Sequence, residues 1–311
     1  LAGAIEMKMK RREFLVRSLA GVGGVMVAGP MVLGQEKPAR PTGTFDPYER
    51  FELGKTGIKV SRLCQGTGVK GGGQESNHTR MGAEKFSAII RGGFERGIRV
   101  YDLADLYGTH PYVVPALKGI PRKEYVIISK IWFRGGGLKI QERPDADVVV
   151  QRFLKELKTD YIDLLLLHCC TDGDWNVKLQ KHMEIMAALK KKGVIRAHGV
   201  SCHSQAALKT AAAEPWVDSV HARINPFGEK MDGPAEEVAP VLKQMHAAGK
   251  AVIGMKILGE GTFGDDEEKK NASIKYALEL GCIDVLNVGF EDVKQIDDFA
   301  ERVGKVRRVK A

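Results

Sequence analysis

The chain has 311 residues, 43% of them hydrophobic, and residues 50–311 contain no unbroken apolar run long enough to span a membrane. Its length suits one large domain of about 250 to 270 residues, a size that α/β barrels often fill. The formal net charge is +9, of which residues 1–40 supply +4, and no basic stripe with interleaved aromatic residues points to a nucleic-acid partner. Five cysteines without a CxxC pair argue against a disulfide framework and against a zinc or iron–sulfur centre, so we expect no metal.

The first 34 residues have the pattern of an export signal. Arg11 and Arg12 come just before a weakly apolar, glycine-rich stretch at residues 19–34. This pattern resembles the bacterial twin-arginine signal, which directs proteins across the membrane after they have folded. The resemblance implies passage through the twin-arginine translocon, cleavage just before Gln35 and a periplasmic or otherwise exported protein.

An uncleaved membrane anchor is the alternative for the same segment. Residues 19–34 are short and rich in glycine for a stable span, which favours cleavage and leaves no stable span in the mature chain. Residues 35–49 are then predicted to form a polar, proline-containing linker, and residues 50–311 the folded domain.

From residue 50 onward, short apolar runs alternate with helical periodicity. A helix is predicted over residues 145–160, where apolar residues follow the i, i+3, i+4, i+7 stripe and Asp145 is placed to cap the first turn. The predicted strands are residues 58–65, 98–103, 125–131, 161–168, 195–201, 219–225, 251–258 and 283–288.

Eight strand–helix units in series predict an α/β fold, a single-domain (β/α)8 TIM barrel. The fourth strand is almost entirely apolar, as expected for a strand that is buried on both faces. A doubly wound open sheet is the alternative, but that fold does not require eight strand–helix units. The glycine-rich residues 69–75 also lack the spacing of a dinucleotide-binding turn, and we interpret them as a flexible loop.

Polar residues stand at the ends of three consecutive predicted strands, where barrel enzymes carry their chemistry. Asp102, Lys130 and His168 end the second, third and fourth strands, and Tyr107 follows Asp102 in the next loop. Taken singly, each has an ordinary explanation: a helix cap for the aspartate, a structural ion pair for the lysine and a core position for the histidine. Together they predict a proton-transfer site.

The expected chemistry centres on the phenol of Tyr107. A phenol titrates near a pKa of about 10, and a neighbouring ammonium group lowers that pKa. We therefore expect Lys130 to make Tyr107 a better acid and Asp102 to keep Lys130 charged. His168 is expected to orient a carbonyl oxygen through a hydrogen bond.

Segments spread along residues 51–303 resemble those of the aldo-keto reductase family. The matching segments, in order, are FELGKTGIKVSRLCQGTG, YDLADLYG, VIISK, YIDLLLLH, GVIRAHGVS and INPFG. The resemblance implies a (β/α)8 barrel that opens with an N-terminal β-hairpin and binds an extended nicotinamide dinucleotide, NADP or NAD. It also implies a catalytic tetrad of Asp102, Tyr107, Lys130 and His168. In that tetrad Tyr107 is the general acid in carbonyl reduction and the base in alcohol oxidation.

The resemblance is weaker on the cofactor side. Ser201 matches the serine that holds the nicotinamide carboxamide in the family, but Cys202 replaces the asparagine after it. His221 and Ile224 stand in place of a glutamine and a ring-stacking tyrosine, and Asn225 is retained. We expect His221 to hydrogen-bond the carboxamide and Ile224 to pack against the nicotinamide ring.

The last two strands supply further predicted cofactor contacts. Lys256 and Leu258 follow the seventh strand, where a lysine can meet the pyrophosphate, although a strand-end lysine that faces solvent is the alternative. Glu291 lies near the start of the last helix, where a carboxylate repels a 2′-phosphate and favours NAD over NADP. A simple interaction with the helix dipole explains Glu291 equally well.

Two pairs of neighbouring residues flank the predicted tetrad. Trp132 and Phe133 follow Lys130 and are predicted to line the substrate pocket, unless one of them packs under a barrel loop. Cys169 and Cys170 follow His168, and we expect two small core residues rather than a strained vicinal disulfide.

The predicted function is transfer of a hydride between nicotinamide and a small carbonyl or alcohol substrate, such as an aldehyde, ketone or sugar, without a metal. Because a periplasm has no evident supply of free cofactor, the export signal further suggests a tightly held NADP or NAD. A non-catalytic or regulatory NAD(P)-binding barrel of the same family is the alternative.

Overall fold

The computed structural model describes residues 43–138 and 143–308. The predicted export signal and residues 35–42 of the predicted linker lie outside these described residues. The end of that linker contacts the barrel, because Thr44 forms a bridge with Arg307 and the Phe45 amide donates to the Val306 carbonyl at 3.0 Å. Within the described ranges, no helix has the length and apolar character needed to cross a membrane.

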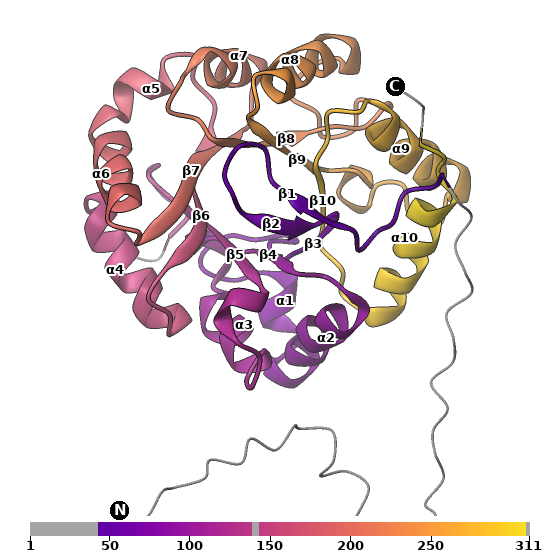
Figure 1. Cartoon of the computed structure of the whole chain (residues 1–311), viewed down its shortest axis with the longest axis horizontal. Helices are drawn as coiled ribbons and strands as arrows, with labels where there is room; N and C mark the ends of the chain where they lie inside the picture. Colours follow the sequence, from indigo (N-terminus) through magenta and orange to yellow (C-terminus); the bar gives the residue numbers. More distant parts are fainter. Residues whose placement is uncertain (1–42, 139–142, 309–311) are drawn as a thin grey trace, which may run out of the picture. The chain divides into compact units, whose positions relative to one another are not determined.

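Eight parallel strands close into a barrel in the order β10-β3-β4-β5-β6-β7-β8-β9 (Figure 1). This arrangement confirms the predicted (β/α)8 fold. The strands are β3 Leu63–Gly66, β4 Val100–Asp102, β5 Val126–Ile131, β6 Ile162–Cys170, β7 Ile195–Cys202, β8 Ser219–Arg223, β9 Ala251–Met255 and β10 Val285–Val288.

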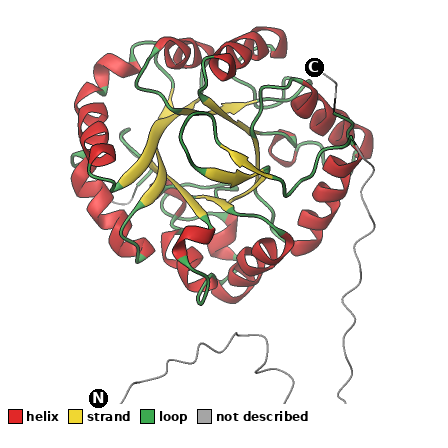
Figure 2. Cartoon of the chain, viewed as in Figure 1, coloured by secondary structure: helices red, strands yellow, loops and turns green. Residues whose placement is uncertain are grey.

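Helices form a ring around the strands (Figure 2). The α-helices are α1 Asn77–Arg80, α2 Ala83–Arg96, α3 His110–Ala116, α4 Ala146–Leu157, α5 Trp175–Lys178, α6 Gln180–Lys191, α7 Gln205–Ala213, α8 Ala235–Ala247, α9 Glu267–Glu279 and α10 Val293–Lys305. Short 3-10 turns are η1 Asp105–Tyr107, η2 Arg122–Glu124 and η3 Gly259–Gly261. Asp145 lies at the N-cap of α4 as predicted, but its carboxylate pairs with Lys181 at 2.7 Å and does not cap the helix.

A β-hairpin precedes the barrel and closes one end of it. Strand β1 (Arg50–Glu52) pairs antiparallel with β2 (Lys59–Ser61), and Figure 1 shows the hairpin across the centre of the strand ring. The predicted first strand, residues 58–65, is therefore two strands, because the chain leaves the hairpin at Arg62 before β3 begins. The hairpin side chains Leu53, Ile58 and Val60 are fully buried with the side chains inside the barrel.

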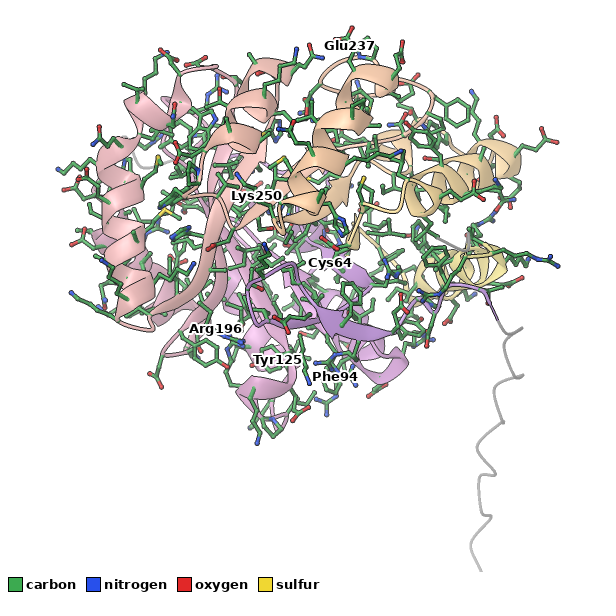
Figure 3. The ribbon with its side chains drawn as sticks, turned by 45° about the horizontal axis from the view of Figure 1, so that its top comes forward. Cys64, Phe94, Tyr125, Arg196, Glu237 and Lys250 are labelled. Atoms are coloured by element: carbon green, nitrogen blue, oxygen red, sulfur yellow. The ribbon has the colours of Figure 1, made fainter. Side chains whose placement is uncertain are left out.

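Side chains alternate between the two faces of each strand, and this alternation divides the apolar residues into two hydrophobic cores. On β6, Leu164 and Leu166 belong to the cluster inside the barrel, whereas Leu165 and Leu167 belong to the larger cluster between strands and helices. The same alternation directs the next residue of the inner set, His168, toward the barrel axis. Figure 3 shows the two environments: Cys64 lies within the barrel and Glu237 of α8 lies at its outer edge.

Candidate active site

The four predicted catalytic residues meet at the C-terminal mouth of the barrel. Asp102 ends β4, and Lys130 and His168 lie near the ends of β5 and β6. These three strands are neighbours in the barrel, so the three side chains lie close together at the mouth. Lys130 Nζ donates to Asp102 Oδ1 at 2.5 Å and to the Leu103 carbonyl at 2.9 Å. The Tyr107 hydroxyl lies 3.3 Å from His168 Nε2. The strand-end rule thus located Asp102, Lys130 and His168, and Tyr107 lies in the short turn η1 that follows Asp102.

The relation between Lys130 and Tyr107 differs from the expectation. Both residues are described, yet no hydrogen bond joins them, and Lys130 Nζ lies 5.0 Å from the centroid of the Tyr107 ring. Burial of the hydroxyl and the nearby Asp102 carboxylate raise the pKa of Tyr107 well above its ordinary value. The expected acidification by Lys130 is therefore not found, because the groups that shift the pKa of Tyr107 all raise it. Tyr107 keeps its proton at neutral pH, which suits a proton donor.

The Asp102 carboxylate has two further partners that the sequence did not indicate. His221 Nε2 lies 3.2 Å from Asp102 Oδ1, and Asn287 Nδ2 donates to Asp102 Oδ2 at 2.7 Å. Burial by itself raises the pKa of this carboxyl, but Lys130 and His221 hold it below the usual range. Asp102 is therefore a carboxylate that anchors an ammonium, an imidazole and an amide. Alternation along β10 could have identified Asn287 as an inward-facing residue, because it lies two residues after Val285, whose side chain is inside the barrel.

His168 is a neutral imidazole in this environment. Burial, followed by the charge of Lys130 and the neighbouring His203, lowers the pKa of His168 well below its ordinary value. Its ring makes an edge contact with Trp132, at 5.5 Å between centroids, which places Trp132 beside the site. Phe133 instead packs against the core between strands and helices. Phe133 is therefore not placed in the substrate pocket by these contacts, and its role there stays a prediction.

A groove of about 620 Å³ leads away from the four residues, from Asp102 and Tyr107 toward α10. The predicted cofactor contacts Lys256, Leu258 and Glu291 all line it. Other lining residues include Lys70, Met255, Phe263, Lys270, Asn287 and Phe290.

Other predicted cofactor residues have structural partners. Ser201 Oγ accepts the Cys169 amide at 2.9 Å, and Asn225 Oδ1 accepts the amides of Phe227 and Glu229 within its own loop. Their contacts with a cofactor stay predictions.

The prediction for Ile224 is wrong, because its side chain is fully buried in the outer core. Strand alternation turns Ile224 away from the axis, and Met255 of β9 is the apolar residue that lines the groove.

Cys169 and Cys170 are both free thiols, as expected. Cys169 has a φ of 65°, in the left-handed region, and its amide is held by Ser201. Burial raises the pKa of both thiols, so neither is a thiolate at neutral pH. They act as small packing residues beside His168.

A second polar cluster at the mouth was not found from the sequence. Arg223, at the end of β8, contacts His203 Nδ1 through one terminal nitrogen, and its other terminal nitrogen lies 3.1 Å from Asp232 Oδ1. The His203 and His168 rings are 6.4 Å apart. Burial, with the charge of Arg223 and other cations, lowers the pKa of His203 to about 3. Alternation along β8 could have predicted that Arg223 faces the barrel axis, because it lies two residues after the inward-facing His221.

Two glycines fix the position of Tyr107. Gly108 has a φ of 66°, and a Cβ there would lie 1.9 Å from the Gln74 carbonyl oxygen, so only glycine fits after Tyr107. On the other side of the ring, a Cβ on Gly68 would lie 2.4 Å from Tyr107 Cζ. The loop after β3 therefore packs directly on the phenol.

We expect Gly68→Ala to lower turnover about tenfold or more, because the added methyl group displaces the Tyr107 ring and misplacement of about 1 Å costs up to about 10² in rate. Steady-state kinetics measure this effect. Gly72→Ala is the matched control, since a Cβ on Gly72 meets nothing within 4 Å. Equal turnover of Gly68→Ala and Gly72→Ala would contradict the packing described.

The fold and the site together define a (β/α)8 barrel with a proton-transfer group at its mouth. The Aldo/keto reductase family model matches residues 62–301, and the chain belongs to this family.

Curated relatives include the methylglyoxal reductase DkgB of Salmonella typhimurium, 30% identical over 43% of this chain and 48% of the relative. The aldo-keto reductase YhdN of Bacillus subtilis is 31% identical over 63% of this chain and 58% of the relative. The chain thus spans about half the length of these relatives.

Solved structures confirm the fold. An aldo-keto reductase from Bacillus halodurans, in its holo form, superposes with a TM-score of 0.67 at 21% identity, covering 85% of this chain and 93% of that one. An aldo/keto reductase from Klebsiella pneumoniae, in complex with NADP and acetate, superposes with a TM-score of 0.62 at 20% identity, covering 83% and 90%.

Proposed function

We propose that this protein is an NAD(P)-dependent oxidoreductase that transfers a hydride between nicotinamide and a carbonyl or alcohol substrate. The observation that carries the proposal is the hydroxyl of Tyr107, 3.3 Å from His168 Nε2, at one end of the groove. Membership of a family with named reductases supports it. Small aldehydes such as methylglyoxal are the first substrates to test, since one relative is a methylglyoxal reductase.

The groove suits an extended dinucleotide. Lys70, Lys256 and Lys270 line it and can meet phosphates, Lys256 and Lys270 by exchanging their present partners Glu260 and Glu267, each 2.6 Å away. Asn287 lines the same end as Tyr107 and Asp102, and its Oδ1 is a buried acceptor with no hydrogen-bond partner among the described residues. An acceptor of this kind suits an N–H group of a nicotinamide carboxamide, so Asn287 is the proposed contact, whereas the predicted contact His221 is fully buried beside Asp102 and is not among the residues that line the groove.

The residues at the mouth have separate roles in this proposal. A bound reduced nicotinamide supplies the hydride to the carbonyl carbon. Tyr107 donates its proton to the carbonyl oxygen, and His168 orients that oxygen. Asp102 holds Lys130 beside the Tyr107 ring, where the ammonium stabilises the phenolate that forms. In alcohol oxidation the proton returns along the same path.

Cofactor preference is proposed to be NAD over NADP. Glu291 and Asp298 both line the far part of the groove, and carboxylates there repel a 2′-phosphate and accept a hydrogen bond from a 2′-hydroxyl. The solved relative that contains NADP shows that the fold also accepts the phosphorylated form. Glu291→Gln is the variant that reports on this preference.

The test titrates NADH and NADPH into the purified protein, followed by turnover of methylglyoxal and simple aldehydes. We expect nucleotide binding, tighter binding of NADH than of NADPH, and a smaller difference between them in Glu291→Gln. Binding without turnover of any carbonyl or alcohol would favour the regulatory, non-catalytic barrel. Absence of binding to either nucleotide, in protein that neither carries nor releases a nicotinamide dinucleotide, would refute both functions.

We also propose that the protein is exported folded with its cofactor already bound. The support is the Arg11–Arg12 pair and the glycine-rich segment that follows it, together with a site that needs a nicotinamide. Protein recovered from the periplasm and then denatured should release about one nicotinamide dinucleotide per chain. A cytoplasmic location, or a periplasmic protein free of nucleotide, would contradict this part of the proposal.

A further inference from the structure

The segment that carries Tyr107 is bordered by two buried polar residues that do not face the mouth. Asp105, two residues before Tyr107, is buried, and its Oδ2 accepts from an Arg152 terminal nitrogen at 2.9 Å. His110, three residues after Tyr107, is also buried, and its Nδ1 lies 2.7 Å from Glu156 Oε2. Both borders of the Tyr107 segment are therefore tied to helix α4.

The two residues on α4 are joined to each other. Arg152 and Glu156 are one helical turn apart, and the second terminal nitrogen of Arg152 donates to Glu156 Oε1 at 3.0 Å. The guanidinium thus bridges the carboxylates of Asp105 and Glu156 with its two terminal nitrogens, a fork geometry that a lysine ammonium does not reproduce. Burial by itself raises the pKa of Glu156, but His110 and Arg152 hold that pKa below its usual value.

The network also reaches the strand that carries Lys130. His110 Nε2 lies 2.8 Å from the Ser129 hydroxyl, and Ser129 precedes Lys130 on β5. The connected groups, which we name the α4 clamp, are Asp105, Arg152, Glu156, His110 and Ser129.

We propose that the α4 clamp positions the Tyr107 hydroxyl relative to His168 and Lys130, with Arg152 and Glu156 as positioning residues. The expected effect on kcat rests on the proposed function, whereas the expected effect on the position of the Tyr107 hydroxyl does not. Tyr107 lies in η1, a turn of only three residues, and its own hydroxyl contacts only His168 among the described residues. The clamp holds both borders of that short turn against a long helix.

The kinetic test compares Arg152→Met with the wild type. We expect kcat to fall about 10- to 100-fold, because misplacement of the reacting group by about 1 Å has effects of this size, while the affinity for NADH stays within about twofold. Arg152→Lys is expected to recover thermal stability but little of kcat, since one ammonium does not bridge both carboxylates. Glu156→Gln, which keeps the volume of the side chain, is the milder variant if Arg152→Met folds poorly.

A double-variant cycle separates positioning from general destabilisation. If Arg152 acts through Tyr107, adding Arg152→Met to Tyr107→Phe should not lower the residual rate further. Arg196→Met is the matched control, because Arg196 pairs with the buried Asp163 at 2.8 Å and stands near the start of β7, away from the mouth (Figure 3). It should lose stability and keep kcat.

A structural readout makes failure of the clamp distinguishable from failure of the proposed function. In a crystal structure of Arg152→Met, the Tyr107 hydroxyl should move out of hydrogen-bond reach of His168 Nε2, whether or not the protein turns over any carbonyl. An unmoved hydroxyl would overturn the proposal. So would an unchanged kcat, or an equal fall in rate with and without the Tyr107 hydroxyl.

Discussion

Tyr107→Phe is expected to lower kcat for carbonyl reduction by about 10² to 10⁴-fold, the range over which a positioned proton donor contributes. Phenylalanine fills the same space beside Gly68 and keeps the ring contact with His168, so the change removes only the hydroxyl. The affinity for NADH should stay within about twofold. Steady-state kinetics and a fluorescence titration measure the two quantities.

Tyr101→Phe is the matched control for this prediction. Its hydroxyl is also buried and donates to the Ile90 carbonyl at 3.2 Å, but it faces the core between strands and helices. Its loss should cost about 1 kcal/mol of unfolding free energy and leave kcat unchanged. Turnover by Tyr107→Phe at the wild-type rate would show that another group donates the proton.

Lys130→Met is expected to lower the free energy of unfolding by about 3 to 5 kcal/mol, because it leaves the buried Asp102 carboxylate without its cation. Turnover should be lost as well, since the ammonium beside the Tyr107 ring is gone. Urea unfolding followed by circular dichroism gives the stability, and aldehyde reduction gives the activity.

The double variant Lys130→Met/Asp102→Asn separates the two effects. Removing both charges should restore much of the stability, because an amide in place of Asp102 can still bond His221 and Asn287. It should restore none of the turnover. A single Lys130→Met variant that is as stable as the wild type would mean that His221 and Asn287 alone satisfy the carboxylate.

Strand composition and strand ends explain what could be predicted from the sequence. The run at residues 161–168 is almost entirely apolar, so its assignment as a strand buried on both faces followed from its composition. The rule that barrel chemistry lies at strand ends then brought Asp102, Lys130 and His168 together.

The predictions that were wrong or missing concern features that strand periodicity does not determine. The hairpin strand β2 and the barrel strand β3 are separated by Arg62 alone, so the single strand predicted at residues 58–65 covered the end of one strand and the start of another. The outward direction of Ile224 depends on where β8 ends, and a shift of one residue exchanges the two faces. The partners of Asp102 come from strands that are distant in sequence, so alternation on β10 indicated that Asn287 faces inward but not that it pairs with Asp102.

Transfer of deuterium tests the central claim most directly. NADH that carries two deuterium atoms at C4 of the nicotinamide ring is mixed with the protein and methylglyoxal in ordinary water, and the alcohol product is examined by mass spectrometry. Direct transfer at the Tyr107 mouth predicts one deuterium on the former carbonyl carbon of each product molecule, at a rate that falls in Tyr107→Phe. A product that forms without deuterium, or a labelled product that forms at an unchanged rate in Tyr107→Phe, would contradict the account.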